Sequence, residues 1–145
     1  MSQSNTRVGD VRVAAGEDLT GKEGFLAKMT HDSGVPEVLL PGSGVDYALY
    51  VVIEGAADTE NVSVRPIEAG RNIRVKLDGT CNPGDVLVLA DVATPADKGK
   101  VRVLPEDEGT YRGLAIAEEA GVDEQLVLAR PAMIGVITVP GAVIM

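Results

Sequence analysis

Apolar and polar residues alternate with a period of two in several stretches of the chain. Residues 61–65 (Asn-Val-Ser-Val-Arg) place both valines on one face, and residues 72–77 and 100–103 repeat the pattern with basic residues on the other face. Such alternation is typical of strands with one buried and one solvated side. Residues 47–53 and 86–90 are apolar on both faces, which predicts strands that are covered on both sides.

Glycine and proline interrupt the chain so often that long helices have no room. No stretch free of both residue types exceeds ten residues. An interior Gly costs a helix about 1 kcal/mol and a Pro about 3 kcal/mol, and globular helices average about 11–12 residues. The pattern predicts an all-β fold, a compact antiparallel β-sandwich or small β-tulip-like β-barrel. It leaves room for one short helix, at residues 115–120.

The two ends of the chain differ from the middle. Residues 1–10 are polar and predict a flexible arm, followed by a single β domain over residues 11–145. Residues 132–145 carry no charge and predict a C-terminal strand, which is too short for the ~20 residues that span a bilayer. This strand either lies buried in its own domain or packs across a subunit interface. In the second case the interface residues are Met133, Ile134, Val136, Ile137 and Val139.

Composition and charge reduce the number of partners that the protein can be expected to bind. The chain has 145 residues and a formal net charge of −9. Nucleic-acid binding requires clustered Lys and Arg, and binding to anionic membranes requires basic patches, so neither partner is expected. The N-terminus lacks the apolar run of a signal peptide, which favours a soluble protein made in the cytoplasm.

The residue types that carry most catalytic chemistry are scarce. His31 is the single histidine and lies in a polar, turn-like stretch, while Cys81 is the single cysteine and lies among turn residues. A lone His does not predict a zinc site, and the acidic runs at 106–108 and 118–119 lack the spacing of a calcium loop. We therefore expect no enzyme activity, no cofactor and no metal, with these runs solvated.

Lys28 offers an alternative interpretation. The stretch Leu26-Ala27-Lys28-Met29-Thr30 resembles the Lys-Met hairpin of biotinyl and lipoyl carrier domains. Such a carrier needs its lysine at the tip of an exposed turn, whereas Lys28 falls inside a predicted strand that begins at Phe25.

From residue 70 onward, strand-forming runs alternate with turns in an ordered succession. The succession consists of a run at 73–77, the turn Asn82-Pro83-Gly84-Asp85, a run at 86–89, a strand opened by Gly99-Lys100, a Gly-containing return at 113–120 and a closing strand at 126–130. This arrangement resembles the small head decoration, or cement, proteins of tailed bacteriophages.

The resemblance implies a non-enzymatic structural protein of the virion. Such proteins are made in the host cytoplasm, form homotrimers and bind the major capsid protein on the outer surface of the expanded shell. A polar arm is then the expected capsid contact, formed by Ser2, Gln3, Ser4, Asn5, Thr6, Arg7 and Val8. Another β-rich virion part, such as a tail or spike domain, is the second interpretation.

Overall fold

The computed structural model describes residues 9–141, which form ten strands and one single-turn 3-10 helix, η1 (Pro95–Asp97). The all-β prediction is confirmed. The strands are β1 (Val11–Ala15), β2 (Leu26–Asp32), β3 (Val35–Leu39), β4 (Tyr50–Glu54), β5 (Asn61–Pro66), β6 (Ile73–Lys76), β7 (Val86–Leu89), β8 (Val101–Val103), β9 (Gly109–Ala117) and β10 (Leu126–Val139).

The first five strands close into a small barrel in the order β1-β3-β2-β4-β5. All neighbours are antiparallel except β1 and β3, which run parallel and pair only through Ala14 with Glu37 and Ala15 with Val38. The barrel core consists of aliphatic side chains and Phe25.

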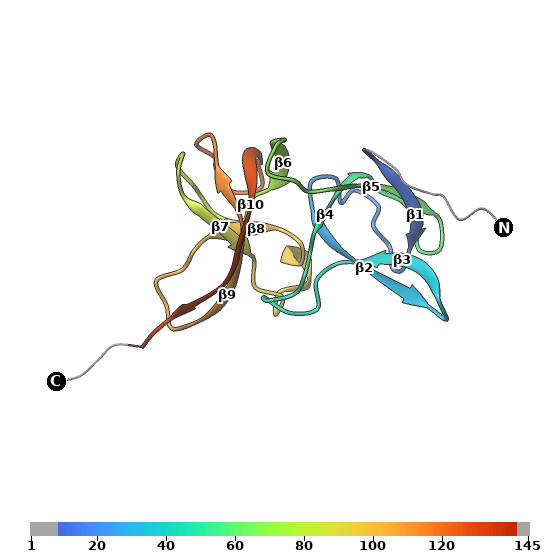
Figure 1. The fold of residues 1–145 in the computed structure, drawn as a ribbon, viewed down its shortest axis with the longest axis horizontal. Coiled ribbons are helices and arrows are strands. Elements are labelled where there is room, and N and C mark those ends of the chain that lie inside the picture. The colour runs from blue at the N-terminus through green and yellow to red at the C-terminus, as the bar shows by residue number, and fades with distance from the viewer. Residues whose placement is uncertain (1–8, 142–145) are drawn as a thin grey trace.

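The last five strands form a second, antiparallel sheet in the order β6-β10-β9-β7-β8. It lies beside the barrel and has its own apolar cluster, which includes Leu77, Leu87, Leu89 and Val127 (Figure 1). Strand β10 is longer than its neighbours, and its outer end extends away from the barrel (Figure 1).

Residues 24–27 and 51–52 form a wall shared by the two cores. Phe25 and Ala27 belong to the barrel core, whereas Leu26 between them belongs to the core of the second sheet. Val51 and Val52 divide in the same way. Strands covered on both faces must be apolar at consecutive positions, which explains the unbroken apolar run that the sequence shows here.

Backbone hydrogen bonds join the same wall to both sheets. The Gly24 N–H donates to the Val52 carbonyl at 2.8 Å, and the Lys76 N–H donates to the Gly24 carbonyl at 2.9 Å. The Leu26 N–H donates to the Gly99 carbonyl at 2.7 Å, which attaches the loop before β8 to the barrel.

Three sequence predictions differ from the structure. Residues 115–120 form no helix, because residues 115–117 belong to β9, which pairs with β10 and, between Gly113 and Ile116, also with β7, and a bend follows. The predicted closing strand at 126–130 and the predicted C-terminal strand at 132–145 are, as far as Val139, one strand, β10, continuous through a bulge. His31 lies inside β2 and pairs with Pro36, so it is a strand residue and not a turn residue.

We predict that Gly99→Ala destabilises the junction between the sheets more than an equivalent change at an open position. Gly99 has φ +88°, and an added Cβ would lie 2.7 Å from the Leu26 carbonyl oxygen. Left-handed strain of about 1 kcal/mol and overpacking of about 1–3 kcal/mol should together lower the free energy of unfolding by about 3 kcal/mol. Gly84→Ala is the matched control, because Gly84 has φ +91° and open space around it. Urea unfolding measures both variants, and equal losses would show that the Gly99 contact is not tight.

Candidate functional site

The outer halves of β9 and β10 form a two-stranded ribbon. Gly109 to Gly113 of β9 pair with Val139 to Gly135 of β10, and β6 reaches β10 only as far as Ala129. Among residues 9–141, the edge of β10 beyond Pro131 therefore has no ladder partner. A two-stranded ribbon is marginally stable in water by itself. This ribbon is the first candidate for an interaction surface.

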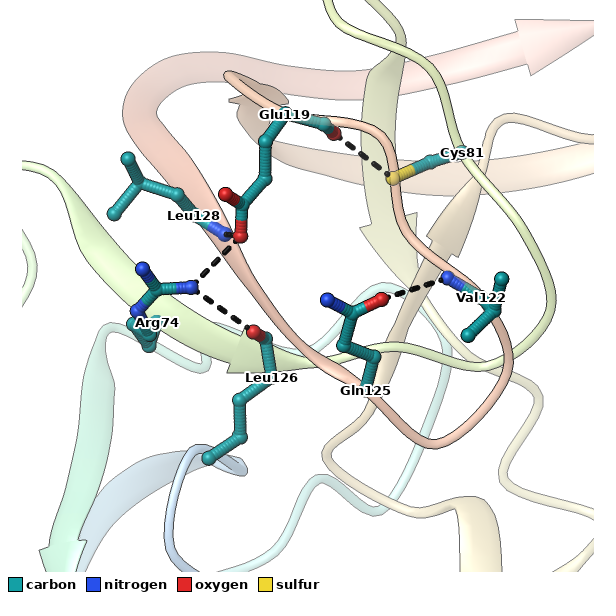
Figure 2. Close-up of polar contacts among 7 residues, drawn as sticks. All are labelled: Arg74, Cys81, Glu119, Val122, Gln125, Leu126 and Leu128. Atoms are coloured by element: carbon teal, nitrogen blue, oxygen red, sulfur yellow. Dashed lines mark hydrogen bonds and ion pairs between the residues drawn. The ribbon is translucent and has the colours of Figure 1, made fainter.

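The loop before β10 is hydrogen-bonded to the inner end of β10, where this strand still pairs with β6 and the ribbon has not yet begun (Figure 2). Glu119 Oε1 accepts hydrogen bonds from the Leu128 N–H at 3.0 Å and from Arg74 Nη1 at 2.7 Å. Arg74 also donates to the Leu126 carbonyl at 3.2 Å, and the Cys81 thiol lies 3.6 Å from the Glu119 carbonyl oxygen. The Leu128 N–H, followed by Arg74, lowers the pKa of Glu119 against the opposing effect of burial. One carboxylate thus joins β6, β10 and the loop between β9 and β10.

A bulge redirects β10 where it leaves the sheet. The register with β9 shifts between Pro131 and Gly135, and Gly135 has φ +85°, a conformation that favours glycine. Gly113 of β9 leaves room for Ile134 and Ile137, whose atoms would lie 2.9 Å and 3.1 Å from a Cβ at that position. The small residue therefore lets two isoleucines cover the ribbon.

The five residues predicted as a subunit interface all lie on this ribbon. Met133, Ile134 and Val136 are exposed, with Met133 at 84% and Val136 at 50% of full exposure. Ile137 and Val139 are half-buried. The structure brings these residues together on one strand but exposes three of them more than the other two. The predicted contact residues Ser2 to Val8 lie outside the described residues.

Lys28 does not have the geometry that a carrier lysine needs. It lies in the middle of β2, where it pairs with Leu39 of β3, and its ammonium group contacts Asp46 at 2.9 Å. Asp46 also accepts a hydrogen bond from the Gly42 N–H at 2.7 Å, so Lys28 anchors the loop before β4. Burial of the Asp46 carboxylate itself raises its pKa, but Lys28 and the Gly42 N–H together outweigh this effect, so the pKa of Asp46 is lowered overall.

The other singled-out residues have structural roles. His31 is exposed, and its Nδ1 accepts a hydrogen bond from the Gly34 N–H at 2.9 Å. Cys81 is buried, and burial raises the pKa of its thiol. Glu118 pairs with Arg130 at 3.3 Å, and residues 106–108 are exposed.

Within residues 9–141, no three His, Cys, Asp or Glu side chains are placed to hold a metal ion, and no helix is long and apolar enough to cross a membrane.

One buried charge was not singled out in the sequence. Lys100 is 4% exposed, and its ammonium group contacts Asp97 at 2.8 Å and also Glu124. Burial lowers its pKa, but the two carboxylates outweigh burial, so the pKa of Lys100 is raised overall. Asp78 lies in the same acidic surroundings, where burial and then the charges of Asp97 and Asp123 raise its pKa. The positive charge of Lys100 therefore offsets the negative charges of Asp97, which lies in the loop before β8, and of Glu124.

Two hollows on the surface were also not predicted from the sequence. A cleft of about 370 Å³ between the barrel and the second sheet is lined by Arg65, Arg71 and Arg74. Two of these arginines already pair with carboxylates, Arg65 with Asp10 and Arg74 with Glu119. A larger groove, of about 640 Å³, opens between β1 and β3 and is mainly apolar. In the sequence, Pro36 within a strand-forming run marks an interruption of strand pairing but does not by itself indicate a groove.

No family model and no curated protein matches the chain. Its fold is similar to that of the N base of head fiber gp8.5 from bacteriophage phi29, with a TM-score of 0.65. The match covers 86% of this chain and 93% of that chain, at 13% sequence identity. At that identity, the likeness shows a shared fold.

We predict that Glu119→Gln destabilises the protein at neutral pH and that the difference disappears in acid. Because the pKa of Glu119 is lowered by folding, its charge contributes stability above the unfolded value of 4.5, which is lost as the pH falls through the lower folded value. Urea unfolding at pH 7 and pH 3 should therefore separate the variant from the parent only at pH 7. Glu118→Gln, whose carboxylate makes one 3.3 Å contact, is the neighbouring control and should change little. An equal deficit of Glu119→Gln at both pH values would contradict the role of the charge.

Proposed function

We propose that this chain is a structural protein of a bacteriophage virion that decorates the outside of the head. In the proposed arrangement it forms a homotrimer, binds the major capsid protein through residues 2–8 and stabilises the expanded shell without catalysing a reaction. The observation that carries the proposal is the fold, since the arrangement of this chain's barrel and five-stranded sheet is similar, with a TM-score of 0.65, to the fold of the N base of a phage head fiber.

The ribbon supports assembly into an oligomer. Met133, Ile134 and Val136 expose apolar side chains on a strand whose outer edge is unpaired within residues 9–141. Isolated apolar strand edges attract further strands, so a protein that keeps one needs a partner for it. A neighbouring subunit is the partner that the proposed trimer supplies.

Multiple attachment explains how weak contacts could hold a shell together. A standard protein interface buries about 1,600 Å², but area alone does not fix its affinity. Once one subunit of a trimer is bound, the others act at an effective concentration of the order of millimolar. Three short arms can therefore clamp neighbouring capsid proteins firmly even if each one binds weakly.

The name of the structural neighbour favours a second candidate function, the base of a head fiber. The outer end of β10 leads away from the body of the molecule, which suits a base that presents a further element (Figure 1). Both functions place the chain on a phage head. Cryo-electron microscopy of decorated heads separates them, because a fiber base carries additional density above the base and a cement protein does not.

We predict that the chain without residues 2–8 folds and assembles as the full chain does but no longer decorates capsids. The truncation retains Asp10, whose carboxylate forms 2.6 Å and 3.3 Å contacts with Arg65 and holds the start of β1 against β5. Co-sedimentation with expanded shells of the cognate major capsid protein measures decoration.

The matched control replaces residues 2–8 with a Gly-Ser segment of equal length. It should also fail to bind, because the proposal assigns recognition to the side chains of the arm and not to its length. Retained decoration by the truncated chain would overturn the assigned contact. Binding of the full chain to purified tails and not to heads would overturn the proposed function.

A further inference from the structure

The barrel is split at one end between β1 and β3. The Gly16 N–H donates to the Val38 carbonyl at 2.9 Å, and the register pairs Ala14 with Glu37. In a parallel ladder with this register, the next bond toward the start of β1 would run from the N–H of residue 36 to the Arg12 carbonyl. Residue 36 is proline and has no N–H, so the ladder stops and the two strands separate.

The separation leaves an apolar groove with an unpaired strand edge along one wall. The groove is lined by Val11 and Val13 of β1, by Val35 and Pro36 of β3, and by Met29 of β2. Val35 is 61% exposed, and Met29 is 37% exposed. The volume of about 640 Å³ falls within the range of pockets that hold drug-sized ligands. Together the shape and the free edge suit a short extended segment.

The outer half of β10 matches this groove in chemistry. Residues 131–145 carry no charged side chain. Arg12 is the single charged residue that lines the groove. Because each copy carries a net charge of −9, copies repel one another unless they meet at surfaces without carboxylates. Neither residues 131–145 nor the residues that line the groove include a carboxylate, although Asp32, Glu37 and Asp58 line the hollow next to the groove.

The ribbon and groove of one copy cannot meet. Strand β1 and the outer end of β10 lie at opposite ends of the molecule (Figure 1). A closed trimer also requires two different surfaces that contact each other from subunit to subunit, whereas pairing of β10 with β10 across a two-fold axis gives dimers. Head-to-tail contact between ribbon and groove satisfies both conditions.

Resting on the homotrimer of the proposed function, we propose that the groove between β1 and β3 binds the outer half of β10 from the neighbouring copy. The unpaired edge of that strand adds to β1 where the ladder to β3 has stopped, and the exposed side chains at residues 133–136 fill the apolar groove. Three such contacts close the ring.

Three identical substitutions test this contact. Val35→Lys charges the groove, and Val136→Lys charges the ribbon. Val122→Lys is the matched control, because Val122 is 63% exposed and lies in the loop before β10, outside both surfaces. All three parent side chains are at least half exposed, so each variant should fold, which circular dichroism and urea unfolding verify.

Sedimentation equilibrium should give three copies of the 15.1-kDa chain for the parent and for Val122→Lys. Val35→Lys and Val136→Lys should each be monomeric. An equimolar mixture of these two variants should form a one-to-one heterodimer, because one intact ribbon then meets one intact groove and the ring cannot close. This heterodimer is the result specific to head-to-tail contact.

The remaining outcomes overturn the inference in distinguishable ways. A trimeric Val35→Lys with a monomeric Val136→Lys would show that ribbons pack against each other. A trimeric Val35→Lys that no longer co-sediments with shells would assign the groove to the capsid protein. A parent chain that is monomeric but still decorates shells would reject this contact and the trimer while leaving attachment to the head intact.

Discussion

The structure depends on one wall of side chains that faces two cores. Phe25 and Ala27 pack into the barrel, Leu26 packs into the second sheet, and Val51 and Val52 repeat this division. Burying one such aliphatic side chain contributes about 1.5–3 kcal/mol. Each residue of the wall stabilises one core, and the backbone bonds through Gly24 and Leu26 connect the two. A polar residue in this segment would therefore weaken both sheets, and with them the placement of the ribbon relative to the groove.

The fold class could be predicted from the sequence because it follows from local preferences. Dense glycine and proline exclude long helices, and alternation at 61–65 and 72–77 marks two strands that the structure contains. The division into a barrel and a second sheet could not be predicted, since the apolar run at 47–53 indicates burial on both faces without showing that the faces belong to different cores.

The candidate interface was found through its lack of charge. The exposure of its individual side chains could not be predicted, because the bulge at Gly135 changes which side chains face outward. The groove arises from strand pairing between distant segments, so Pro36 alone could not reveal it.

The basic side chains are largely engaged within the chain, which limits how it can recognise a partner. Among residues 9–141, six lysines and arginines form ion pairs, and three more lie over aromatic rings. Surface ion pairs contribute little stability, with typical values of about 0–1 kcal/mol each. Their effect here is to neutralise the few positive charges of an acidic protein. Recognition by charge therefore falls to the acidic exterior, whereas the proposed contact between ribbon and groove involves mainly apolar side chains.

An unpaired apolar strand edge carries a cost, because it can pair with any other exposed edge and lead to aggregation. Head-to-tail contacts avoid this outcome only if the rotation between subunits closes a ring, since a rotation that does not close gives open filaments. The direction in which the ribbon leaves the sheet sets that rotation. The bulge between Pro131 and Gly135 lies where the ribbon leaves the sheet and so sets this direction, whereas Glu119 and Arg74 hold the inner end of the same strand. The proposed ring therefore depends on this bulge, because a ribbon that left the sheet at another angle would meet the neighbouring copy with a different rotation.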